Sequence, residues 1–516
     1  MKIRELFANI EHELIRGDAD AEIAGIRIDS RLADRGDMFV AVVGAKADGH
    51  DHIGEAVARG VAAVLTCKDI SASSIDGSPG VAIIRVADTR EILSALVNEF
   101  HGRPSERFRL IGVTGTNGKT SVSAMIDGIL RFAGHKTGLL GTIDNYCGGK
   151  ALSVRRTTPT TPDCVELGEI MSQMAKEGAD DLIMEVSSMG LKTGRVNALT
   201  FDVGVFTNIS PEHLDDHGTM DDYRASKLRL FSLSDHAVIN ADDPFSLAIE
   251  ENARGDVLRY GIENRKESVL CAENISYEGD TVSFDMTYDR EKDGSGADRG
   301  RSTSGVSVRA ERIALDTPSR FAVYNALAAM GAALRSGVDF SLAAAALREG
   351  VRIAGRFEII RGPDGVTAIV DYAHTAEALK NLLMSVRANP SYARVVSVFG
   401  CGGDRDRGKR EPMGRISGDL ADFTIITSDN PRTEDPLEII RAIESGARAS
   451  GGEFATEPDR RKAIERAAAS ASAGTVIVVS GKGHEDYQIL GDRKIHFDDR
   501  EIVREAFDRR GGISGA

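Results

Sequence analysis

A glycine-rich turn that ends in Lys-Thr is the feature of this sequence with the clearest chemical potential. Residues 115–120 are Gly-Thr-Asn-Gly-Lys-Thr, and they lie between an apolar run, Arg109–Val113, and a segment whose apolar residues recur at helical spacing. A turn between a strand and a helix brings backbone N–H groups and the positive end of the helix close to a phosphate. In this context Lys119 would contact the β- and γ-phosphates of ATP, and the hydroxyl of Thr120 would reach Mg²⁺. A strict phosphate loop has glycine where this chain has Val113, so the loop is a variant; the simpler alternative is a tight turn without a ligand.

Four polar motifs follow predicted strands in the last third of the chain. They are Asp371–His374, Gly400–Arg410, Asp429–Arg432 and Gly481–Glu485. Ligands of a doubly wound sheet bind outside the carboxyl ends of its strands, so we expect the four motifs to converge on one site. Arginines such as Arg410 and Arg432 bind carboxylates through planar pairs of N–H groups. Acceptors for an ammonium group stand beside them, which suits an amino acid that carries a second amino-acid centre: Asp429, Asn430 and Glu485.

The elements that must position these residues fall into three segments. At roughly 100–200 residues per domain, the 516 residues predict about three domains. We expect an N-terminal α/β domain at 1–106, a central ATP-binding domain at 107–352 and a C-terminal domain at 353–516. Short apolar runs predict strands, here given in chain order: Met38–Val43, Val61–Thr66, Val81–Val86, Leu182–Val186, Phe201–Phe206, Ala237–Asn240, Val366–Val370, Val395–Phe399, Phe423–Thr427 and Val476–Ser480. Other patterns predict a helix at Ile53–Arg59, a linker at His101–Glu106 and an exposed loop at Glu291–Ser304.

Composition narrows the class of protein. The net charge of −15 argues against a nucleic-acid-binding surface, although a local basic site for an anionic small molecule remains compatible with it. The sequence has no run of about 18 apolar residues, so no membrane span is expected. The N-terminus lacks the apolar stretch of a secretory signal. The five cysteines are scattered without a CxxC pair, so neither a disulfide framework nor a zinc site is indicated. We therefore expect a cytoplasmic protein, and a monomer.

The sequence of the phosphate loop resembles that of the Mur ligase family and of its relative folylpolyglutamate synthase. Thr114–Thr120 is the family's variant loop, and further family motifs occur in the family's order along essentially the whole chain. They are Asp29–Arg31, a Thr-Thr-Pro element, Glu185–Ser188, Thr207–Asp215, Lys227, Asn240–Pro244, Gly355–Glu358 and the four strand-end motifs. Thr-Thr-Pro occurs twice, at Thr157–Pro159 and Thr160–Pro162, and the second copy fits the family spacing before Glu185. The resemblance implies an α/β fold of three domains: a UDP-binding domain, a P-loop ATPase domain and a Rossmann-like C-terminal domain.

The resemblance also implies an activity and its ligands. It implies ATP-dependent addition of meso-diaminopimelate to a UDP-linked muramoyl dipeptide through an acyl phosphate, with ATP and Mg²⁺, in cell-wall synthesis. The implied ATP-binding residues are Gly115, Thr116, Asn117, Gly118, Lys119, Thr120, Asn325, Arg356, Asp371 and His374. The implied contacts of the UDP-muramoyl dipeptide are Ser30, Thr160, Thr161, Ser187, Thr193 and Arg195. The implied diaminopimelate-binding residues are Arg410, Asp429, Asn430, Pro431, Arg432, Gly481 and Glu485.

The implied metal and catalytic residues include a modified lysine. Thr120 and Glu185 would hold one Mg²⁺, with a second near His213 and a carbamylated Lys227; Lys119, His213 and Lys227 would be catalytic. An acid at a strand end near a phosphate loop is well placed for Mg²⁺. From its pattern alone, the helical stretch Tyr223–Phe231 favours a solvent-exposed Lys227 instead.

Some positions depart from the family pattern, and two other functions remain open. Met189 stands where the family has histidine, Thr193 where glutamine is common, and Ala322 where asparagine is frequent. These departures affect single substrate contacts. One alternative is another amino-acid-adding ligase, either the lysine-adding homologue or folylpolyglutamate synthase, against which the Asp-Asn-Pro-Arg motif and the N-terminal domain argue. The other is a P-loop ATPase that works as a switch, which would leave the four strand-end motifs unexplained.

Overall fold

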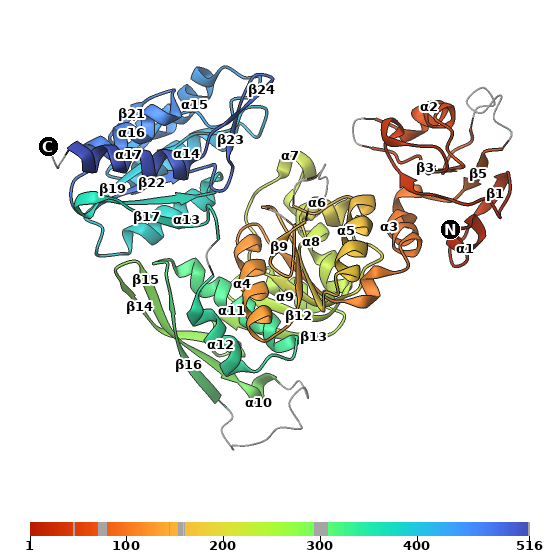
Figure 1. The fold of residues 1–516 in the computed structure, drawn as a ribbon. Helices are drawn as coiled ribbons and strands as arrows, with labels where there is room; N and C mark the ends of the chain where they lie inside the picture. Colours follow the sequence, from red (N-terminus) through yellow and green to blue (C-terminus); the bar gives the residue numbers. More distant parts are fainter. Residues whose placement is uncertain are drawn as a thin grey trace.

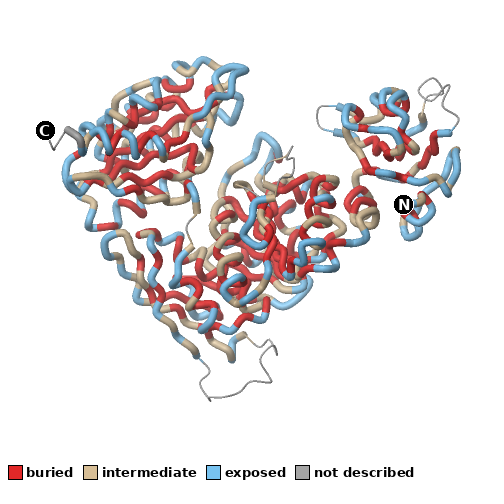
Figure 2. Tube along the Cα trace, viewed as in Figure 1, coloured by how far each residue is buried: buried red, intermediate tan, exposed pale blue. Residues whose placement is uncertain are grey.

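Three lobes follow one another along the chain in the computed structural model (Figure 1). The structure describes residues 1–44, 47–70, 80–143, 145–152, 158, 160–293, 308–351 and 353–513. Each lobe has a sheet whose central strands are buried, whereas edge strands such as β1 are mostly exposed (Figure 2). This confirms the predicted mixed α/β fold of three units.

The N-terminal lobe is a five-stranded sheet of order β1-β5-β4-β3-β2, in which only β1 runs antiparallel to its neighbour. The strands predicted around Phe39, Val64 and Ile83 are all present, each shorter than the apolar run. The elements are α1 (Ile3–Leu6), β1 (Glu13–Arg16), β2 (Ile26–Arg27), β3 (Met38–Val40), α2 (Ile53–Ala58), β4 (Ala63–Thr66), β5 (Ala82–Arg85) and α3 (Thr89–Phe100). A 3₁₀ turn at Pro104–Arg107 leads into the next lobe.

The central lobe is built on an eleven-stranded sheet of order β16-β15-β14-β13-β12-β11-β6-β10-β7-β8-β9. Successive residues of β6 point to opposite faces, so Leu110 joins one buried cluster while Ile111 and Val113 join another. The strands are β6 (Arg109–Thr114), β7 (Thr137–Leu140), β8 (Asn145–Cys147), β9 (Lys150–Ala151), β10 (Asp181–Glu185), β11 (Phe201–Phe206), β12 (Ser234–Asn240), β13 (Asp256–Gly261), β14 (Leu270–Glu278), β15 (Thr281–Asp289) and β16 (Val308–Leu315). The helices are α4 (Lys119–Phe132), α5 (Cys164–Lys176), α6 (Ser188–Lys192), α7 (Leu214–His217), α8 (Met220–Ser232), α9 (Ser246–Asn252), α10 (Arg290–Asp293), α11 (Arg320–Arg335) and α12 (Phe340–Glu349).

The parallel part of this sheet places the phosphate loop. Strands β10, β6, β11 and β12 are parallel neighbours, so their carboxyl ends meet at one edge. The loop after β6, Glu185 at the end of β10 and Thr207 after β11 therefore come together there. The predicted loop Glu291–Ser304 begins instead within helix α10, and its residues from 294 onward lie outside the described part of the chain.

The C-terminal lobe is a six-stranded sheet of order β17-β18-β22-β19-β20-β21. The four predicted strands form its parallel centre, as expected, and β17 adds an antiparallel edge. The elements are β17 (Glu358–Arg361), β18 (Thr367–Asp371), α13 (Ala376–Arg387), β19 (Arg394–Phe399), α14 (Arg410–Leu420), β20 (Phe423–Ile426), α15 (Pro436–Ser450), β21 (Phe454–Thr456), α16 (Arg460–Ser470), β22 (Thr475–Ser480), the hairpin β23 (Tyr487–Leu490) and β24 (Arg493–His496), and α17 (Asp499–Ile513). Among the described helices, none is both long and apolar enough to cross a membrane.

Candidate active site

The phosphate loop is packed too closely for larger residues at its glycines. Gly115 has φ +152°, and a Cβ there would lie 1.9 Å from Oγ1 of Thr207. Gly118 has φ +88°, and its Cβ would lie 2.8 Å from Oδ1 of Asn325. Only glycine fits both positions. Asn325, which the resemblance implies to bind ATP, borders the loop at Gly118.

Lys119 folds back over the loop. Its ammonium donates to the carbonyl oxygens of Gly115 and Thr116, at 2.8 and 2.9 Å. Burial lowers the pKa of Lys119, which the nearby carboxylates of Glu212 and Glu185 oppose. A lysine over a glycine-rich turn at the N-terminus of a helix is an arrangement that suits a polyphosphate.

The segment after β11 supports the loop from behind. Asn208 accepts the backbone N–H of Asn117 at 3.0 Å and donates to its carbonyl at 3.1 Å. The hydroxyl of Thr116 accepts from the backbone of Ser210 at 3.0 Å and lies 3.0 Å from the hydroxyl of Tyr223. These contacts fix the loop in one conformation before any ligand arrives.

Glu185 is buried among oxygen donors that suit a cation. Thr120 donates its hydroxyl to Oε2 of Glu185 at 3.1 Å, so two predicted metal ligands already lie side by side. Thr142 donates to the same carboxylate through its hydroxyl and its backbone N–H, both at 2.8 Å. Carboxylate and hydroxyl oxygens are the ligands that Mg²⁺ prefers, so the donor set fits this ion.

Lys227 is buried, and the expectation of a solvent-exposed lysine is therefore wrong. Its side chain is 1% exposed, and Nζ lies 4.6 Å from the centre of the Tyr223 ring. Burial, together with the charge of Lys119, holds the pKa of Lys227 well below its ordinary value, while Glu212 opposes the shift. The helical spacing itself contains the signal: Lys227 follows Tyr223 by four residues and precedes Phe231 by four, so all three lie on one face.

His213 lies in a more open place than Lys227. It is exposed, has φ +57°, and could share a metal ion with Asp215 and Asp216, whose ligand atoms lie within 4.8 Å of one another and of its own. Its ring centre lies 6.3 Å from that of Tyr223, the residue that Lys227 also contacts. The metal role of His213 stays a prediction.

Glu212 is a candidate that the sequence did not single out. Its carboxylate faces both buried lysines, Lys119 and Lys227, and raises the pKa of each. It also lies 3.7 Å from Nε2 of His374 in the C-terminal domain and 3.9 Å from Nε2 of His213. The sequence alone does not distinguish Glu212, because its loop contains several other acidic residues.

Arg356 brings the C-terminal domain onto the phosphate loop. Its guanidinium donates to the hydroxyl of Thr120 at 3.1 Å and lies 4.6 Å from the centre of the Tyr372 ring. Its Nε is buried without a hydrogen-bond partner among the described residues. Asp371 accepts the backbone N–H groups of Phe357 and Ala373, and burial raises its pKa. Arg356, a predicted ATP-binding residue of the C-terminal domain, therefore contacts the loop of the central domain.

The four strand-end motifs converge, as predicted. The backbone N–H of Gly481 donates to the carbonyl of Asp371 at 3.1 Å, and that of Gly403 donates to the carbonyl of Asn430 at 2.9 Å. A Cβ at Gly481 would lie 2.7 Å from Oδ2 of Asp429. Asn430 also donates to Glu485 at 2.9 Å, so one site contains residues from all four strand ends.

The charges of this site are mixed. The ammonium of Lys482 is buried and donates to Oδ1 of Asn430 at 3.0 Å. Burial raises the pKa of Glu485, and the negative charge of the neighbouring Asp429 raises it further. Arg432 donates to the carbonyl of Gly403 at 2.8 Å and has left-handed φ +51°. The preceding residue, Pro431, is buried, and a Cβ at Gly403 would lie 1.9 Å from its carbonyl oxygen, so only glycine fits at position 403.

Arg410 does not offer the free guanidinium that the sequence predicted. It is 4% exposed, and both of its terminal nitrogens donate to the carboxylate of Glu434, at 3.1 and 2.9 Å. The pair also holds the pKa of Glu434 below its ordinary value. Arg405 of the same motif is exposed. Gly402 lies between the two side chains: a Cβ built at Gly402 would lie 2.8 Å from the guanidinium of Arg432 and 3.9 Å from Cγ of Arg405. Arg405, which no sequence pattern distinguishes, is therefore a second arginine available at this site.

A cleft of about 1020 Å³ opens where the N-terminal and central domains meet. Its lining includes Ser30, Thr193 and Arg195, three of the residues predicted to contact the UDP-muramoyl dipeptide. Ser30 donates to Glu55 at 2.7 Å, and the hydroxyl of Thr193 donates to the carbonyl of Met189 at 2.6 Å.

Hydrogen bonds connect this cleft to Glu185. Arg195 donates to the carbonyl of Thr161 at 2.7 Å, and Thr161 donates to Oγ of Ser187 at 3.0 Å. Thr160, with φ +63°, lies 3.0 Å from the hydroxyl of Thr142, which binds Glu185. The predicted dipeptide residues thus form a path from the cleft to the metal candidate.

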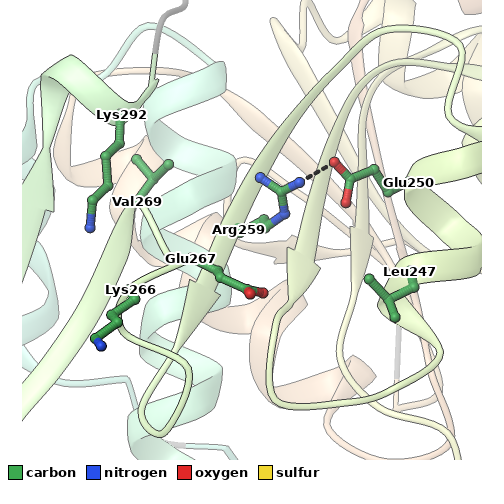
Figure 3. Close-up of a pocket in the computed structure, with 7 residues that line it drawn as sticks. All are labelled: Leu247, Glu250, Arg259, Lys266, Glu267, Val269 and Lys292. Atoms are coloured by element: carbon green, nitrogen blue, oxygen red, sulfur yellow. Dashed lines mark hydrogen bonds and ion pairs between the residues drawn. The ribbon is translucent and has the colours of Figure 1, made fainter.

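A smaller hollow of about 500 Å³ lies elsewhere on the central domain (Figure 3). Its residues are Leu247, Glu250, Arg259, Lys266, Glu267, Val269 and Lys292, and Arg259 is paired with Glu250. It shares no residue with the predicted site.

Comparison with known proteins gives this geometry a family. Residues 22–101 match the Mur ligase family catalytic domain, 113–333 the Mur ligase middle domain and 355–483 the Mur ligase glutamate ligase domain. The chain belongs to the Mur ligase family. It is therefore an ATP-dependent ligase that forms amide bonds.

Individual Mur ligases match over nearly the whole chain. A UDP-N-acetylmuramoyl-L-alanyl-D-glutamate–2,6-diaminopimelate ligase of Clostridium acetobutylicum is 39% identical over 98% of this chain and 99% of its own. A solved structure of a ligase with the same name has a TM-score of 0.67 at 29% identity, covering 99% of each chain. A MurF ligase from Thermotoga maritima in complex with ADP shares the fold, with a TM-score of 0.61 at 18% identity over 94% of this chain and 97% of its own.

Proposed function

We propose that the chain adds meso-diaminopimelate to UDP-N-acetylmuramoyl-L-alanyl-D-glutamate, with ATP as the energy source, in the cytoplasmic synthesis of peptidoglycan precursors. The observation that carries the proposal is the convergence of Asp429, Asn430, Arg432 and Glu485 on one site at the strand ends of the C-terminal domain. Relatives named for this reaction match the full chain at 37–39% identity, which supports the same substrates.

The amino-acid site suits a molecule with two amino-acid centres. The Arg432 guanidinium and the exposed Arg405 provide donors for a distal carboxylate. Asp429 and Glu485 provide negative charge for the distal ammonium, and burial beside Asp429 keeps Glu485 basic. L-Lysine has no distal carboxylate, so Arg432 favours diaminopimelate over lysine.

Magnesium fits the oxygen donors near the phosphate loop. Thr120 and Glu185 would hold one ion, and Lys227 with His213 would hold a second if Lys227 were carbamylated. The lowered pKa of Lys227 favours its uncharged amine, the form that can add CO₂ to become a carboxylate-like oxygen ligand. When bound, the ions would neutralise part of the phosphate charge.

The chain's own residues can serve each step of an acyl-phosphate route. Gly115–Thr120 binds the phosphates of ATP, and Lys119 moves from the loop carbonyls to the γ-phosphate. The side-chain carboxylate of the D-glutamyl residue attacks that phosphorus, and ADP leaves. The free amine of diaminopimelate attacks the acyl carbon, and inorganic phosphate leaves. Arg356, with its unpartnered Nε, would stabilise the transferring phosphoryl group.

Product formation with two amino acids tests the specificity. With ATP, Mg²⁺ and the UDP-muramoyl dipeptide, the wild type should form the tripeptide with meso-diaminopimelate and not with L-lysine. Arg432→Ala should raise the KM for diaminopimelate about 10- to 100-fold, the loss expected for one hydrogen bond to a charged group. Equal use of lysine would sink the role of Arg432 and favour the lysine-adding homologue.

A further inference from the structure

A cysteine, a histidine and an aspartate are aligned in the N-terminal domain, outside the ligase site. Sγ of Cys67 lies 3.6 Å from Nε2 of His50, and Nδ1 of His50 lies 2.6 Å from Oδ1 of Asp48. A nucleophile, an imidazole and a carboxylate in this order let the ring accept a proton from the thiol while the carboxylate orients the ring. The three residues are called the Cys67 cluster below.

Hydrogen bonds around the ring define which nitrogen is free to accept a proton. The backbone N–H of Cys67 donates to Nε2 at 3.3 Å, so Nε2 is the acceptor and Nδ1 has the ring proton. Asp48 accepts from that Nδ1, from the backbone N–H of His50 at 3.0 Å and from the ammonium of Lys68. The Lys68 ammonium and these N–H groups hold the pKa of Asp48 well below its ordinary value. The thiol therefore lies 3.6 Å from the acceptor nitrogen of a ring whose other nitrogen is held by a carboxylate.

Separate elements hold the cluster in place. Asp48 caps a 3₁₀ turn, Gly49–His52, which contains His50, and Cys67 directly follows β4. Thr89, the first residue of α3, donates to the carbonyl of Ala41 at 2.7 Å and places its hydroxyl 4.0 Å from Sγ. Asp51 is a further charged group near Lys68 and helps to raise the pKa of that ammonium.

Cys67 differs from the other cysteines of the chain. Cys147, Cys164, Cys271 and Cys401 are buried, whereas Cys67 is partly exposed. Burial raises the pKa of Cys164 and of Cys401 to about 12, and it raises those of Cys147 and Cys271 as well. Thiolates are the reactive form of cysteine, so these four thiols are poor nucleophiles.

We propose that Cys67 is a modification site of this chain, a thiol that His50 and Asp48 activate toward small electrophiles such as hydroperoxides. The thiol proton passes to Nε2 of His50 as sulfur attacks one peroxide oxygen, and from Nε2 it passes to the hydroxide that leaves. An S–O bond forms, the O–O bond breaks, the sulfur is oxidised by two electrons to a sulfenic acid, and hydrogen peroxide is reduced to water. With iodoacetamide an S–C bond forms, the C–I bond breaks and iodide leaves.

The cluster adjoins the cleft between the N-terminal and central domains. Gly49 and His52, on either side of His50 in the same turn, both line that cleft. An adduct on Cys67 removes the room for the His50 ring and shifts the turn. Modification therefore raises the KM for the nucleotide-sugar substrate more than it lowers kcat, a consequence that rests on the proposed function.

Labelling of the full chain with iodoacetamide at pH 7, followed by peptide mass spectrometry, tests the site. Cys67 should react at least about tenfold faster than the other four cysteines, and His50→Gln should slow it about five- to tenfold. Asp48→Asn should also slow the labelling of Cys67, and this variant tests the proposal if His50→Gln does not fold. His52→Gln is the matched control, since His52 faces Glu55 instead of the thiol, and it should label at the wild-type rate. Wild-type rates in both His50→Gln and Asp48→Asn would mean that exposure alone governs Cys67, which overturns the proposal.

Steady-state kinetics of labelled protein tests the coupling to the cleft. Labelled wild type should show a raised KM for the UDP-muramoyl dipeptide, and Cys67→Ser treated in the same way should not. An unchanged KM would refute the coupling and leave the labelling result standing. Absence of ligase activity in untreated protein would refute the proposed function without touching the labelling rates.

Discussion

The guanidinium of Arg356 donates a hydrogen bond of 3.1 Å to the hydroxyl of Thr120, which joins the C-terminal domain to the phosphate loop of the central domain. Thr120 in turn donates to Glu185, so a single hydroxyl connects an arginine of one domain to the metal candidate of another. The position of the C-terminal domain thus determines whether the phosphoryl site is complete. Domain closure and assembly of the catalytic groups are therefore one event.

Arg356→Ala should lower kcat about 10- to 100-fold, because a charge-assisted hydrogen bond at the transferring phosphate is lost. The KM for the UDP-muramoyl dipeptide should change little, since that cleft lies on the other side of the central domain. Arg361→Ala is the matched control: Arg361 also reaches the central domain, through Asp280 at 2.7 Å, but lies largely in solvent. Steady-state kinetics of both variants checks the prediction, and equal losses in the two would show that Arg356 acts only as a domain contact.

Gly115→Ala should abolish binding of ATP. The new methyl group would lie 1.9 Å from Oγ1 of Thr207, and φ +152° is unfavourable for alanine. Gly80→Ala serves as control because a Cβ at Gly80 meets nothing within 4 Å. Calorimetric titration with a non-hydrolysable ATP analogue measures both, and wild-type affinity in Gly115→Ala would exclude this loop as the phosphate site.

Lys227→Met should stabilise the protein while it abolishes ligase activity. Burial lowers the pKa of Lys227 in the folded state, so the unfolded chain binds a proton that the folded chain does not. The free energy of unfolding of the uncarbamylated wild type therefore rises with pH from that lowered pKa up to the ordinary value of about 10.4. Lys227→Met removes this pH dependence. Urea unfolding at pH 7 and pH 9 in CO₂-free buffer measures it.

Lys192→Met is the control for this pH dependence. Lys192 is exposed and paired with Asp222 at 2.7 Å, so its replacement should leave the slope against pH unchanged. Activity of the wild type should also fall when bicarbonate is removed and recover when it is returned, if Lys227 is carbamylated. Full activity of Lys227→Met would contradict any role of this lysine in catalysis.

Mutation of Arg410 should lower the stability of the fold, whereas mutation of Arg432 should weaken binding of meso-diaminopimelate. Arg410→Met removes two hydrogen bonds to the partly buried Glu434, which keeps its ion pair with Arg407 at 3.2 Å, and should destabilise the fold by about 2 kcal/mol. Arg432→Met should leave the melting temperature unchanged and raise the KM for meso-diaminopimelate. Thermal melting together with amino-acid kinetics separates the two effects. A raised KM without loss of stability in Arg410→Met would return Arg410 to the binding site.

Local sequence patterns were sufficient for the parallel sheets and for the convergence in the C-terminal domain. Buried parallel strands are continuous apolar runs, and the ends of parallel strands share an edge, so motifs such as Asp429–Arg432 and Gly481–Glu485 could be placed together without a structure. The antiparallel extension β14–β16 was missed, although Thr281–Asp289 alternates between buried and partly buried residues. The resemblance to known ligases supplied most of the individual roles.

Contacts between residues distant in sequence could not be predicted. Arg410 and Glu434 are separated by 24 residues. The sequence around Arg410 does not indicate that its guanidinium pairs with this carboxylate instead of a substrate. The burial of Lys227 depends on α8 packing against the sheet beneath the phosphate loop. Arg356 reaches Thr120 across 236 residues of sequence, which only the arrangement of the domains reveals.

Transfer of oxygen from substrate to phosphate tests the account most directly. The side-chain carboxylate of the D-glutamyl residue in the UDP-muramoyl dipeptide would be labelled with ¹⁸O at both oxygens, and the phosphate released from ATP would be analysed by mass spectrometry. An acyl-phosphate route transfers one carboxylate oxygen to each phosphate, so turnover with meso-diaminopimelate should release phosphate that contains one ¹⁸O. Unlabelled phosphate, released at the same rate with or without the amino acid, would mean that water attacks ATP and that the chain works as an ATPase switch.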